Sequence, residues 1–332
     1  MTKYNLQPKF MVRAIAMPVI VLFAGALMFA PVEALAAVAK KPTPKQATQK
    51  SPAKLKKVAR IVRVPAVPDL GKDGFPNLLS HAAVVYDALT GRALYSKNAD
   101  NAMPIASITK IMTAMVVLDA KQSLEEAIVI SEADIDLLKS SRSRLPVGSA
   151  FRREDLMRLA LMASDNRAAA ALGRTYPGGS VAFVTAMNAK AQSIKLTQAH
   201  FVDPTGLAPG NVASPQDLAL LVSAASEYKM IREFSTTPEL HVTLPDSGKQ
   251  LGFNNTNSLV KSEGWKIGLS KTGFINEAGK CLVMHATINN NPVVIVLLDS
   301  WGRLARIGDA NRVKKWLEKA KVSPYGAIKA VG

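Results

Sequence analysis

The sequence contains one cysteine, few acidic residues and four histidines, and each scarcity excludes a class of protein. Cys281 alone cannot form an intramolecular disulfide, so the chain is not a disulfide-stabilised scaffold. The sequence has 25 acidic residues and 42 Lys and Arg, which gives a formal net charge of +17. Residues 40–63 hold nine of these cations and no acid, and the chain beyond residue 63 has a net charge of only +6. We therefore expect no nucleic-acid partner, because the excess charge is not spread over a folded surface.

Several enzyme motifs are also absent. The sequence has no G-x-S-x-G, H-E-x-x-H, Walker loop or G-x-G-x-x-G. On one strand, Cys281 and His285 would lie roughly 13 Å apart, beyond hydrogen-bond reach. We expect no metal or cofactor, a buried hydrophobic role for Cys281, and structural roles for the histidines.

The composition is that of a folded protein with an additional N-terminal segment. Of the 332 residues, 48% are hydrophobic and 20% charged, enough for about two domains or one large α/β domain. Lys3, Lys9 and Arg13 precede an apolar run at residues 14–30. With the A-L-A site at residues 34–36, this predicts a signal peptide cleaved after Ala36, so that the mature protein is periplasmic. The alternative is an uncleaved anchor, since such a run can just span a bilayer.

Residues 37–72 are rich in lysine and proline and show no amphipathic period. Like charges repel and prolines extend the chain, which predicts a linker. Two interpretations remain open: the linker is only a spacer, or residues 40–63 contact an anionic cell wall or membrane. We expect the catalytic domain to span residues 73–322, with a tail at 323–332.

Strand patterns occur at both ends of this domain. Residues 81–86 and 92–95 flank Thr90-Gly91 and predict a hairpin. Further strands are predicted at 265–274, 281–288 and 293–299.

Helical periodicity occupies the middle, at residues 107–120, 153–172 and 181–193, with another helix starting after Ser214. A closing helix presents an apolar face at residues 313–317. Strands at both ends with helices between them predict an α/β protein with one antiparallel sheet, covered by a helical insertion.

Ser107 and Lys110 form an S-x-x-K motif at the predicted start of a helix, where positions three apart share a face. The motif alone is weak, because 23 serines and 27 lysines predict about two such pairs by chance and the chain has four. The pair at Ser51 lies in the linker, and of the other three only the pair at Ser107 is followed by S-D-N at 164–166, between helices, and by K-T-G at 271–273, on a strand.

This ordered motif set resembles that of serine penicillin-binding proteins and class A β-lactamases. The surrounding segments PIASITKIMTA, LALMASDNRAAAAL, HFVDPTGL and KTGFINEAGKCLV are similar to the low-molecular-mass D-Ala-D-Ala peptidases. They are most similar to the D-alanyl-D-alanine endopeptidase branch, the type-7 penicillin-binding proteins. The resemblance covers about residues 75–320. It implies a five-stranded antiparallel sheet flanked by helices, an inserted helical subdomain and a site in the cleft between them.

The chemistry of the motif residues fits acyl transfer. Ser107 must lose a proton when it attacks an acyl carbon, and Lys110 can accept this proton only as a neutral amine. A free lysine titrates near 10.4, so its pKa must fall by about 3, which corresponds to roughly 4 kcal/mol, through burial and a neighbouring cation. Lys271 can be that cation. Ser164 can bridge the two amines and pass the proton to the leaving amine.

The other motif residues suit substrate binding. Asn166 offers an amide to a substrate carbonyl, and Lys271 with Thr272 suits a carboxylate. Gly273 lets a backbone approach closely.

The resemblance adds two features. It implies an oxyanion hole formed by the backbone N–H groups of Ser107 and Phe274. It also implies an arginine after the last strand that holds a terminal carboxylate, for which Arg306 is the candidate ahead of Arg303. The segment at residues 203–207 has the composition of a plain turn.

Two absences narrow the expected function. No glutamate lies between Asn166 and Ser226, where class A β-lactamases carry their water-activating residue, so β-lactams should act as covalent inhibitors. Only 59 residues follow Gly273, too few for the extra domain and anchor of membrane-bound DD-carboxypeptidases. We therefore expect a monomeric endopeptidase that cleaves the D-alanyl cross-link to a diamino acid between peptidoglycan stem peptides. A D-Ala-D-Ala carboxypeptidase is the alternative, and a non-catalytic cell-wall-binding protein is the alternative of another class.

Overall fold

The computed structural model of the protein describes residues 68–244, 247–302 and 304–319. Most of the expected signal peptide and linker, Arg303 and the chain beyond residue 319 lie outside the described residues. No helix in the described ranges is long and apolar enough to cross a membrane.

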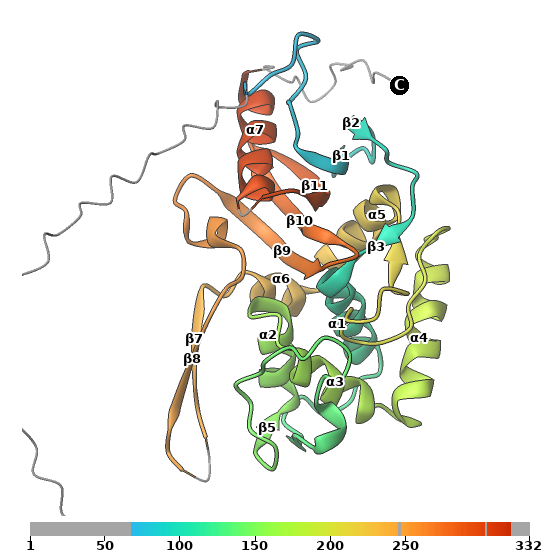
Figure 1. The fold of residues 1–332 in the computed structure, drawn as a ribbon, viewed down its shortest axis with the longest axis vertical. Helices are drawn as coiled ribbons and strands as arrows, with labels where there is room; N and C mark the ends of the chain where they lie inside the picture. Colours follow the sequence, from blue (N-terminus) through green and yellow to red (C-terminus); the bar gives the residue numbers. More distant parts are fainter. Residues whose placement is uncertain (1–67, 245–246, 303, 320–332) are drawn as a thin grey trace, which may run out of the picture. The chain divides into compact units, whose positions relative to one another are not determined.

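A five-stranded antiparallel sheet organises the described residues (Figure 1). Its strands, in spatial order, are β2 (Ala93–Lys97), β1 (Ser80–Asp87), β11 (Asn291–Ser300), β10 (Gly279–Ile288) and β9 (Lys266–Ile275). The first and last strands in sequence are neighbours, with Ala83 opposite Leu297. The predicted α/β class and sheet are therefore confirmed.

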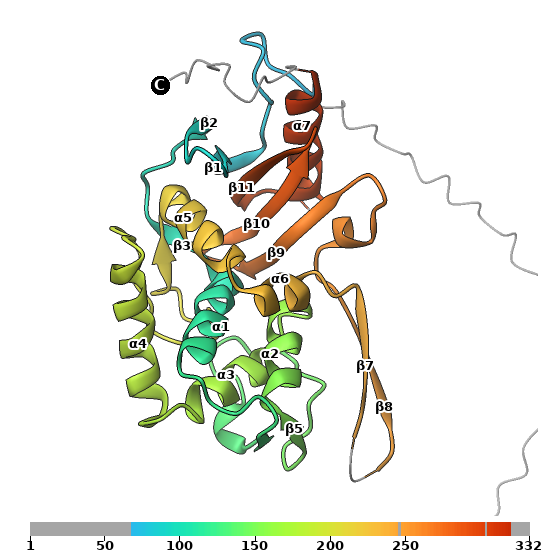
Figure 2. The same cartoon turned by 180° about the vertical axis from the view of Figure 1, so that it is seen from behind.

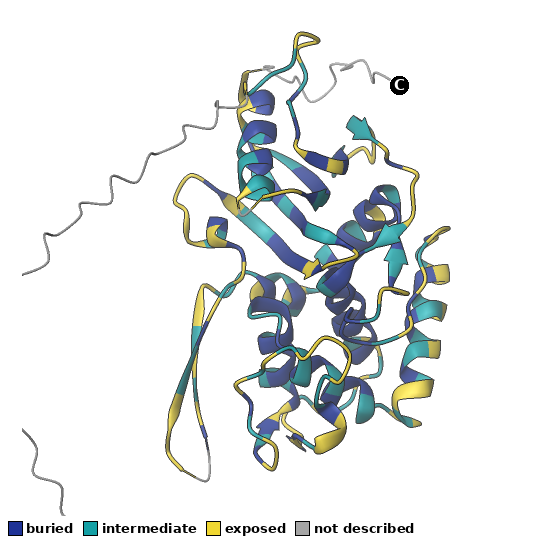
Figure 3. Cartoon of the chain, in the orientation of Figure 1, coloured by how far each residue is buried: buried dark blue, intermediate teal, exposed yellow. Residues whose placement is uncertain are grey.

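Both faces of the sheet are covered, which explains its nearly continuous apolar strands. Because side chains alternate across a strand, Val294 and Val296 face one cluster of buried side chains while Ile295 and Leu297 face another. The second cluster includes Val313 of α7 (Ala305–Lys319), which is fully buried. Figure 3 shows buried segments along this helix. The closing helix therefore packs on the sheet, as its apolar face predicts.

The opposite face is covered by the chain between β2 and β9, as the view from behind shows (Figure 2). Its helices are α1 (Lys110–Asp119), α2 (Arg153–Met162), α3 (Asn166–Arg174), α4 (Gly179–Ser193), α5 (Pro215–Ser226) and α6 (Lys229–Ser235). The helix predicted after Ser214 is α5, and the Ser214 hydroxyl accepts from the backbone N–H of Asp217 at 3.1 Å.

Short elements that the sequence pattern did not predict complete the described fold. Three two-stranded sheets pair β3 (Met103–Pro104) with β6 (Val212–Ala213), β4 (Ala127–Val129) with β5 (Ala150–Arg152), and β7 (Glu239–Thr243) with β8 (Gln250–Asn254). The 3-10 helices are η1 (Ala106–Thr109), η2 (Glu132–Asp134) and η3 (Ser258–Lys261). Loops beside η1 and η2 contribute to the site below.

Candidate active site

Ser107 and Lys110 meet where η1 passes into α1. Ser107 lies in η1 and Lys110 is the first residue of α1, so one helical turn brings the two side chains together. Lys110 is fully buried, and its Nζ lies 2.8 Å from the Ser107 Oγ. Ala106, just before the serine, has a φ of 48°, a left-handed conformation that is strained for a residue with a Cβ.

Two further oxygens surround the Lys110 amine. Its Nζ donates to Asn166 Oδ1 at 2.7 Å and to the carbonyl of Thr205 at 2.6 Å. Neither oxygen can donate in return. A neutral amine has two N–H bonds and one lone pair, so these two acceptors take both hydrogens and leave the lone pair for Ser107 Oγ. The geometry therefore suits removal of the serine proton by Lys110.

Because Lys110 is buried, a substantial fraction of its amine is neutral near physiological pH. Burial lowers the Lys110 pKa from 10.5 to about 7, while the carboxylates of Asp203, Asp165 and Asp136 act in the opposite direction. Burial, Lys110 and Arg306 hold the pKa of Lys271 well below its usual range.

The turn at residues 203–207 aims the Thr205 carbonyl at Lys110. Asp203 fixes this turn by accepting from the backbone N–H groups of Thr205, Gly206 and Ala208 at 2.6, 2.8 and 3.0 Å. The sequence predicts a plain turn here. The segment is a turn, and its Thr205 carbonyl also accepts a hydrogen bond from the candidate base, Lys110.

Residue 206 must be glycine, because the turn at residues 203–207 lies against the backbone of Ala106, next to Ser107. Its φ is 81°, and an added Cβ would lie 2.0 Å from the carbonyl oxygen of Ala106. We expect Gly206→Ala to lower the free energy of unfolding by at least about 2 kcal/mol and to slow acylation, because the residue before Ser107 must move. The control is Gly91→Ala, at a φ of 68° with nothing within 4 Å of the added Cβ, which should cost only about 1 kcal/mol. Equal losses in chemical denaturation would contradict this account.

Ser164 and Asp165 interrupt the helical run predicted at 153–172. Ser164 has a φ of 59°, which ends α2, and Asp165 then caps α3 by accepting from the Ala168 N–H at 3.0 Å. Burial raises the pKa of Asp165. The break turns Ser164 and Asn166 into the cleft side by side, as the S-D-N motif requires.

Lys271 reaches Ser164 from the sheet. It is buried on β9, and its Nζ donates to Ser164 Oγ at 2.8 Å and to the Thr272 carbonyl at 2.9 Å. The expected bridge is therefore only half formed: among the described residues Ser164 is hydrogen-bonded to Lys271 but not to Lys110. The physical reason is that Asn166, Thr205 and Ser107 already fill the positions around the Lys110 amine.

The other K-T-G residues border the same cleft. A Cβ on Gly273 would lie 2.9 Å from the Ile105 carbonyl oxygen and 3.2 Å from Ser107 N, so glycine permits the close approach of β9 to the serine. Arg306, in the first turn of α7, donates to the carbonyls of Gly273 and Cys281 at 3.1 and 3.3 Å. The carboxylate-holding role of Arg306 stays a prediction.

Thr272 and Phe274 flank Gly273 on β9. The Thr272 hydroxyl lies 2.7 Å from that of Thr256. Phe274 is 57% exposed, and the oxyanion role predicted for it would depend only on its backbone N–H. Cys281 is buried, and burial raises its pKa to about 11, as suits a core residue. No group of three or more potential metal ligands occurs in the described part of the chain.

The loop at residues 135–145 also contributes to the site, although no sequence motif identifies it. Its Ser141 Oγ accepts from Asn166 Nδ2 at 2.7 Å, which orients the amide. Lys139 of the same loop reaches across to Glu277, in the β9–β10 turn, at 2.5 Å. A serine in a loop has no spacing signature, so only the fold identifies it.

Acylation should follow the ionisation of Lys110. Because the neutral amine is the reactive form and its pKa is about 7, the acylation rate should rise about tenfold per pH unit below pH 7 and level off above it. The measurement is the second-order rate constant for a labelled penicillin between pH 5 and 9, with circular dichroism to monitor folding. A rate that falls as the pH rises through 7 would show that the protonated amine is required.

The sheet, the helical insertion and the Ser-Lys pair define a serine acyl-transfer enzyme, and comparison with known proteins narrows the class. The family model described as D-alanyl-D-alanine carboxypeptidase (Peptidase S11) matches residues 72–301. The chain belongs to this family of serine peptidases.

Individual relatives and solved structures are consistent with this family assignment. The chain is 46% identical over 270 residues to a D-alanyl-D-alanine endopeptidase of Pseudomonas aeruginosa, covering 81% of this chain and 87% of the relative. It is 44% identical to the Escherichia coli protein of that name, covering 76% and 81%. A Streptomyces K15 DD-transpeptidase structure is similar with a TM-score of 0.68 and 28% identity, over 73% of this chain and 98% of that one. Penicillin-binding protein D2 of Listeria monocytogenes, in its ampicillin-bound form, has a TM-score of 0.61 and 31% identity, over 72% and 97%.

Proposed function

We propose that the protein is a serine DD-peptidase that hydrolyses D-alanyl bonds of peptidoglycan stem peptides through an acyl-enzyme at Ser107. The observation that carries this proposal is the buried Lys110 amine 2.8 Å from Ser107 Oγ, with its two N–H bonds directed at oxygens that cannot donate. Lys110 takes the serine proton as Oγ bonds to the D-alanyl carbonyl carbon.

The carbon–nitrogen bond then breaks, and the leaving amine takes the proton that Lys110 removed from Ser107, so Lys110 is neutral again. We assign the relay of this proton to Ser164, which is hydrogen-bonded to Lys271. The N–H groups of Ser107 and Phe274 hold the oxyanion, while Asn166 holds a substrate carbonyl. Water attacks the ester in the second half-reaction, Lys110 again serving as base, and frees Ser107.

In this account Lys271, Thr272, Gly273 and Arg306 hold the carboxylate of the leaving residue. Arg306 supports the assignment because its guanidinium reaches the carbonyl of Gly273, at the edge of the cleft. β-Lactams acylate Ser107 in place of the peptide, and no other co-reactant is required.

We further propose that cross-link cleavage exceeds release of terminal D-alanine. The names of the two relatives that are 46% and 44% identical support this preference. The test compares conversion of cross-linked muropeptide dimers to monomers with release of D-alanine from a pentapeptide, at equal enzyme and substrate concentrations. Faster dimer conversion is the expected result, and faster D-alanine release would make the protein a carboxypeptidase.

The N-terminal region supports a proposal about location. The apolar run and the A-L-A site at residues 34–36 support export to the periplasm with cleavage after Ala36, and the nine cations of residues 40–63 support contact with an anionic cell wall. Binding of the mature protein to sacculi should weaken with added salt and with replacement of these cations by glutamine. Salt-independent binding, unchanged by the replacement, would reduce the segment to a spacer.

A further inference from the structure

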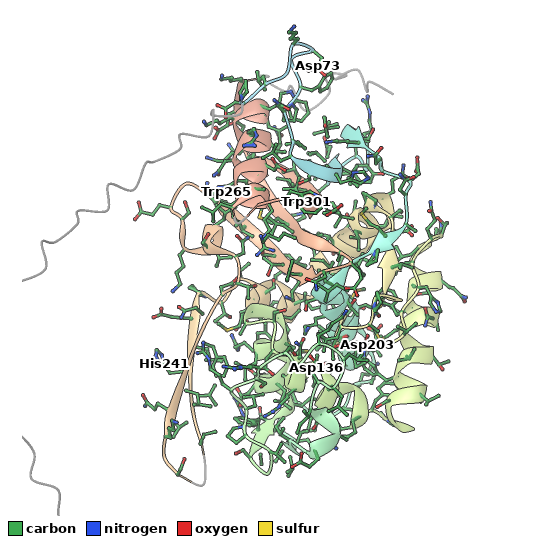
Figure 4. The ribbon with its side chains drawn as sticks, in the orientation of Figure 1. Asp73, Asp136, Asp203, His241, Trp265 and Trp301 are labelled. Carbon is green, nitrogen blue, oxygen red and sulfur yellow. The ribbon has the colours of Figure 1, made fainter. Side chains whose placement is uncertain are left out.

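The exposed aromatic side chains of the described residues gather at one end of the sheet. Trp301, directly after β11, is 78% exposed, and Phe274, near the end of β9, is 57% exposed. Every other aromatic side chain that the structure describes is buried or half-buried, including Trp265 and Trp316. Trp301 is labelled in Figure 4, where it lies beside the sheet. Exposed aromatic surface of this kind marks a place where another molecule binds.

Cross-strand neighbours join the two aromatic residues into one surface. Phe274 lies opposite Lys280 on β10, and Lys280 lies opposite Ser300, the last residue of β11. The Lys280 Nζ lies 5.9 Å from the centroid of the Phe274 ring and donates to the carbonyl of Gly302 at 3.0 Å. Lys280 therefore connects the Phe274 ring with the turn that carries Trp301. We call Phe274, Lys280 and Trp301 the aromatic platform.

The aromatic platform continues the candidate site along one face of the sheet. Phe274 and Thr272 are two residues apart on β9, so their side chains point to the same face. Leu282, opposite Thr272, packs in the cluster that includes α7, which identifies this face as the one that α7 covers. Arg306, in the first turn of α7, donates to the carbonyl of Gly273, which lies between Thr272 and Phe274. The platform therefore adjoins the Thr272 and Arg306 side of the cleft.

The inference rests on the proposed function, in which Thr272 and Arg306 hold the carboxylate of the leaving residue. The two candidate substrates differ on this side of the scissile bond. In a pentapeptide the leaving residue is D-alanine, whose side chain is a methyl group, and the substrate ends there. In a cross-link the leaving residue is a diamino acid whose side chain continues into a second stem peptide. Only a cross-linked substrate can therefore extend from Arg306 over the platform.

The aromatic platform offers the contacts that a peptide requires. Flat aromatic faces pack against aliphatic and amide groups, and they lose little conformational entropy because Phe and Trp have only two side-chain torsions. The Lys280 ammonium has three N–H bonds, and one of them donates to Gly302. The other two can donate to a carboxylate of the stem peptide.

We propose that the aromatic platform binds the second stem peptide of a cross-linked substrate, the one that leaves with the diamino acid. The peptide packs across Trp301 and Phe274, and Lys280 donates to one of its carboxylates. These side chains do not contact the reacting atoms, so the platform raises kcat/KM for cross-linked substrates and not for pentapeptides.

The test replaces Trp301 and uses a dimer of two cross-linked stem peptides, prepared with and without its disaccharides. Trp301→Ala should lower kcat/KM at least about tenfold for both forms of the dimer, because a stacked aromatic contact is lost. Release of D-alanine from a pentapeptide and acylation by penicillin should stay within about twofold of wild type. Trp301→Tyr should keep most of the dimer rate, because it keeps an aromatic face.

Leu89→Ala is the matched control. Leu89 is also exposed, at 73%, but it lies in the β1–β2 turn at the other end of the sheet, where Asp87 pairs with Val293. Its replacement should leave the dimer, pentapeptide and penicillin rates at their wild-type values.

The outcomes separate this inference from the proposed function. An unchanged dimer rate in Trp301→Ala, or an equal loss for dimer and pentapeptide, would overturn the inference and leave the peptidase intact. A loss confined to dimers that carry their disaccharides would also overturn it and would assign Trp301 to the glycan strand. A wild-type protein that cleaves neither substrate and is not acylated would overturn the proposed function, and the inference with it.

Discussion

A Ser107→Ala variant should carry no covalent adduct after incubation with a labelled penicillin, whereas the wild-type protein should gain the mass of one penicillin and keep it. Among the described residues, Ser107 Oγ is the one hydroxyl oxygen hydrogen-bonded to the Lys110 amine, and the variant lacks it. The wild-type adduct should persist because no glutamate lies between Asn166 and Ser226 to activate a water molecule. Intact-mass spectrometry measures both results.

Ser226→Ala is the matched control, because Ser226 begins another S-x-x-K match but donates to the Ser223 carbonyl at 2.7 Å. It should acylate like wild type. An adduct that survives Ser107→Ala would show that another residue is the nucleophile, and rapid loss of the wild-type adduct would mean that the protein is a β-lactamase.

Removing the Lys110 amine should reduce the acylation rate constant by at least about a thousandfold, since general-base activation of the nucleophile is lost. Lys110→Ala removes the base. Lys110→Arg should not restore the rate, because a guanidinium stays protonated and has no lone pair for the serine proton. The measurement is the second-order rate constant for penicillin acylation, with thermal unfolding to show that each variant is folded.

Lys121→Ala is a suitable control for this series, since Lys121 is exposed beyond the end of α1. Its rate should equal that of wild type. Acylation of a folded Lys110→Ala variant within about tenfold of wild type would mean that another group, such as Lys271 through Ser164, takes the proton.

Much of the fold follows from local patterns. The continuous apolar runs of β10 and β11 predict buried strands, and residues 313–317 predict a helix with one covered face, because burial alone sets these patterns. The β7–β8 hairpin was missed because its alternating residues are mostly half-exposed, so hydrophobicity marks it weakly. Helical periodicity runs through residues 153–172, and the strained backbone at Ser164 divides it into α2 and α3, so that S-D-N lies between two helices as expected.

The sequence identifies the side chains of the candidate site, but it does not identify the backbone groups that contribute to the site. Fixed spacing identifies Ser107 and Lys110, and motif order identifies residues 164–166 and 271–273. The Thr205 carbonyl has no side-chain signature, because any residue could supply it. The extent to which burial lowers the Lys110 pKa could not be predicted either, because burial depends on the whole fold.

The most direct test of the account is to trap the acyl-enzyme during turnover of a D-Ala-D-Ala peptide. Rapid acid quenching, digestion and mass spectrometry should find the substrate without its terminal D-alanine attached to Ser107 in the wild-type protein. Ser107→Ala should show neither this adduct nor hydrolysis. Hydrolysis by Ser107→Ala, or an acyl group found on another residue, would contradict the central claim that Ser107 is the nucleophile.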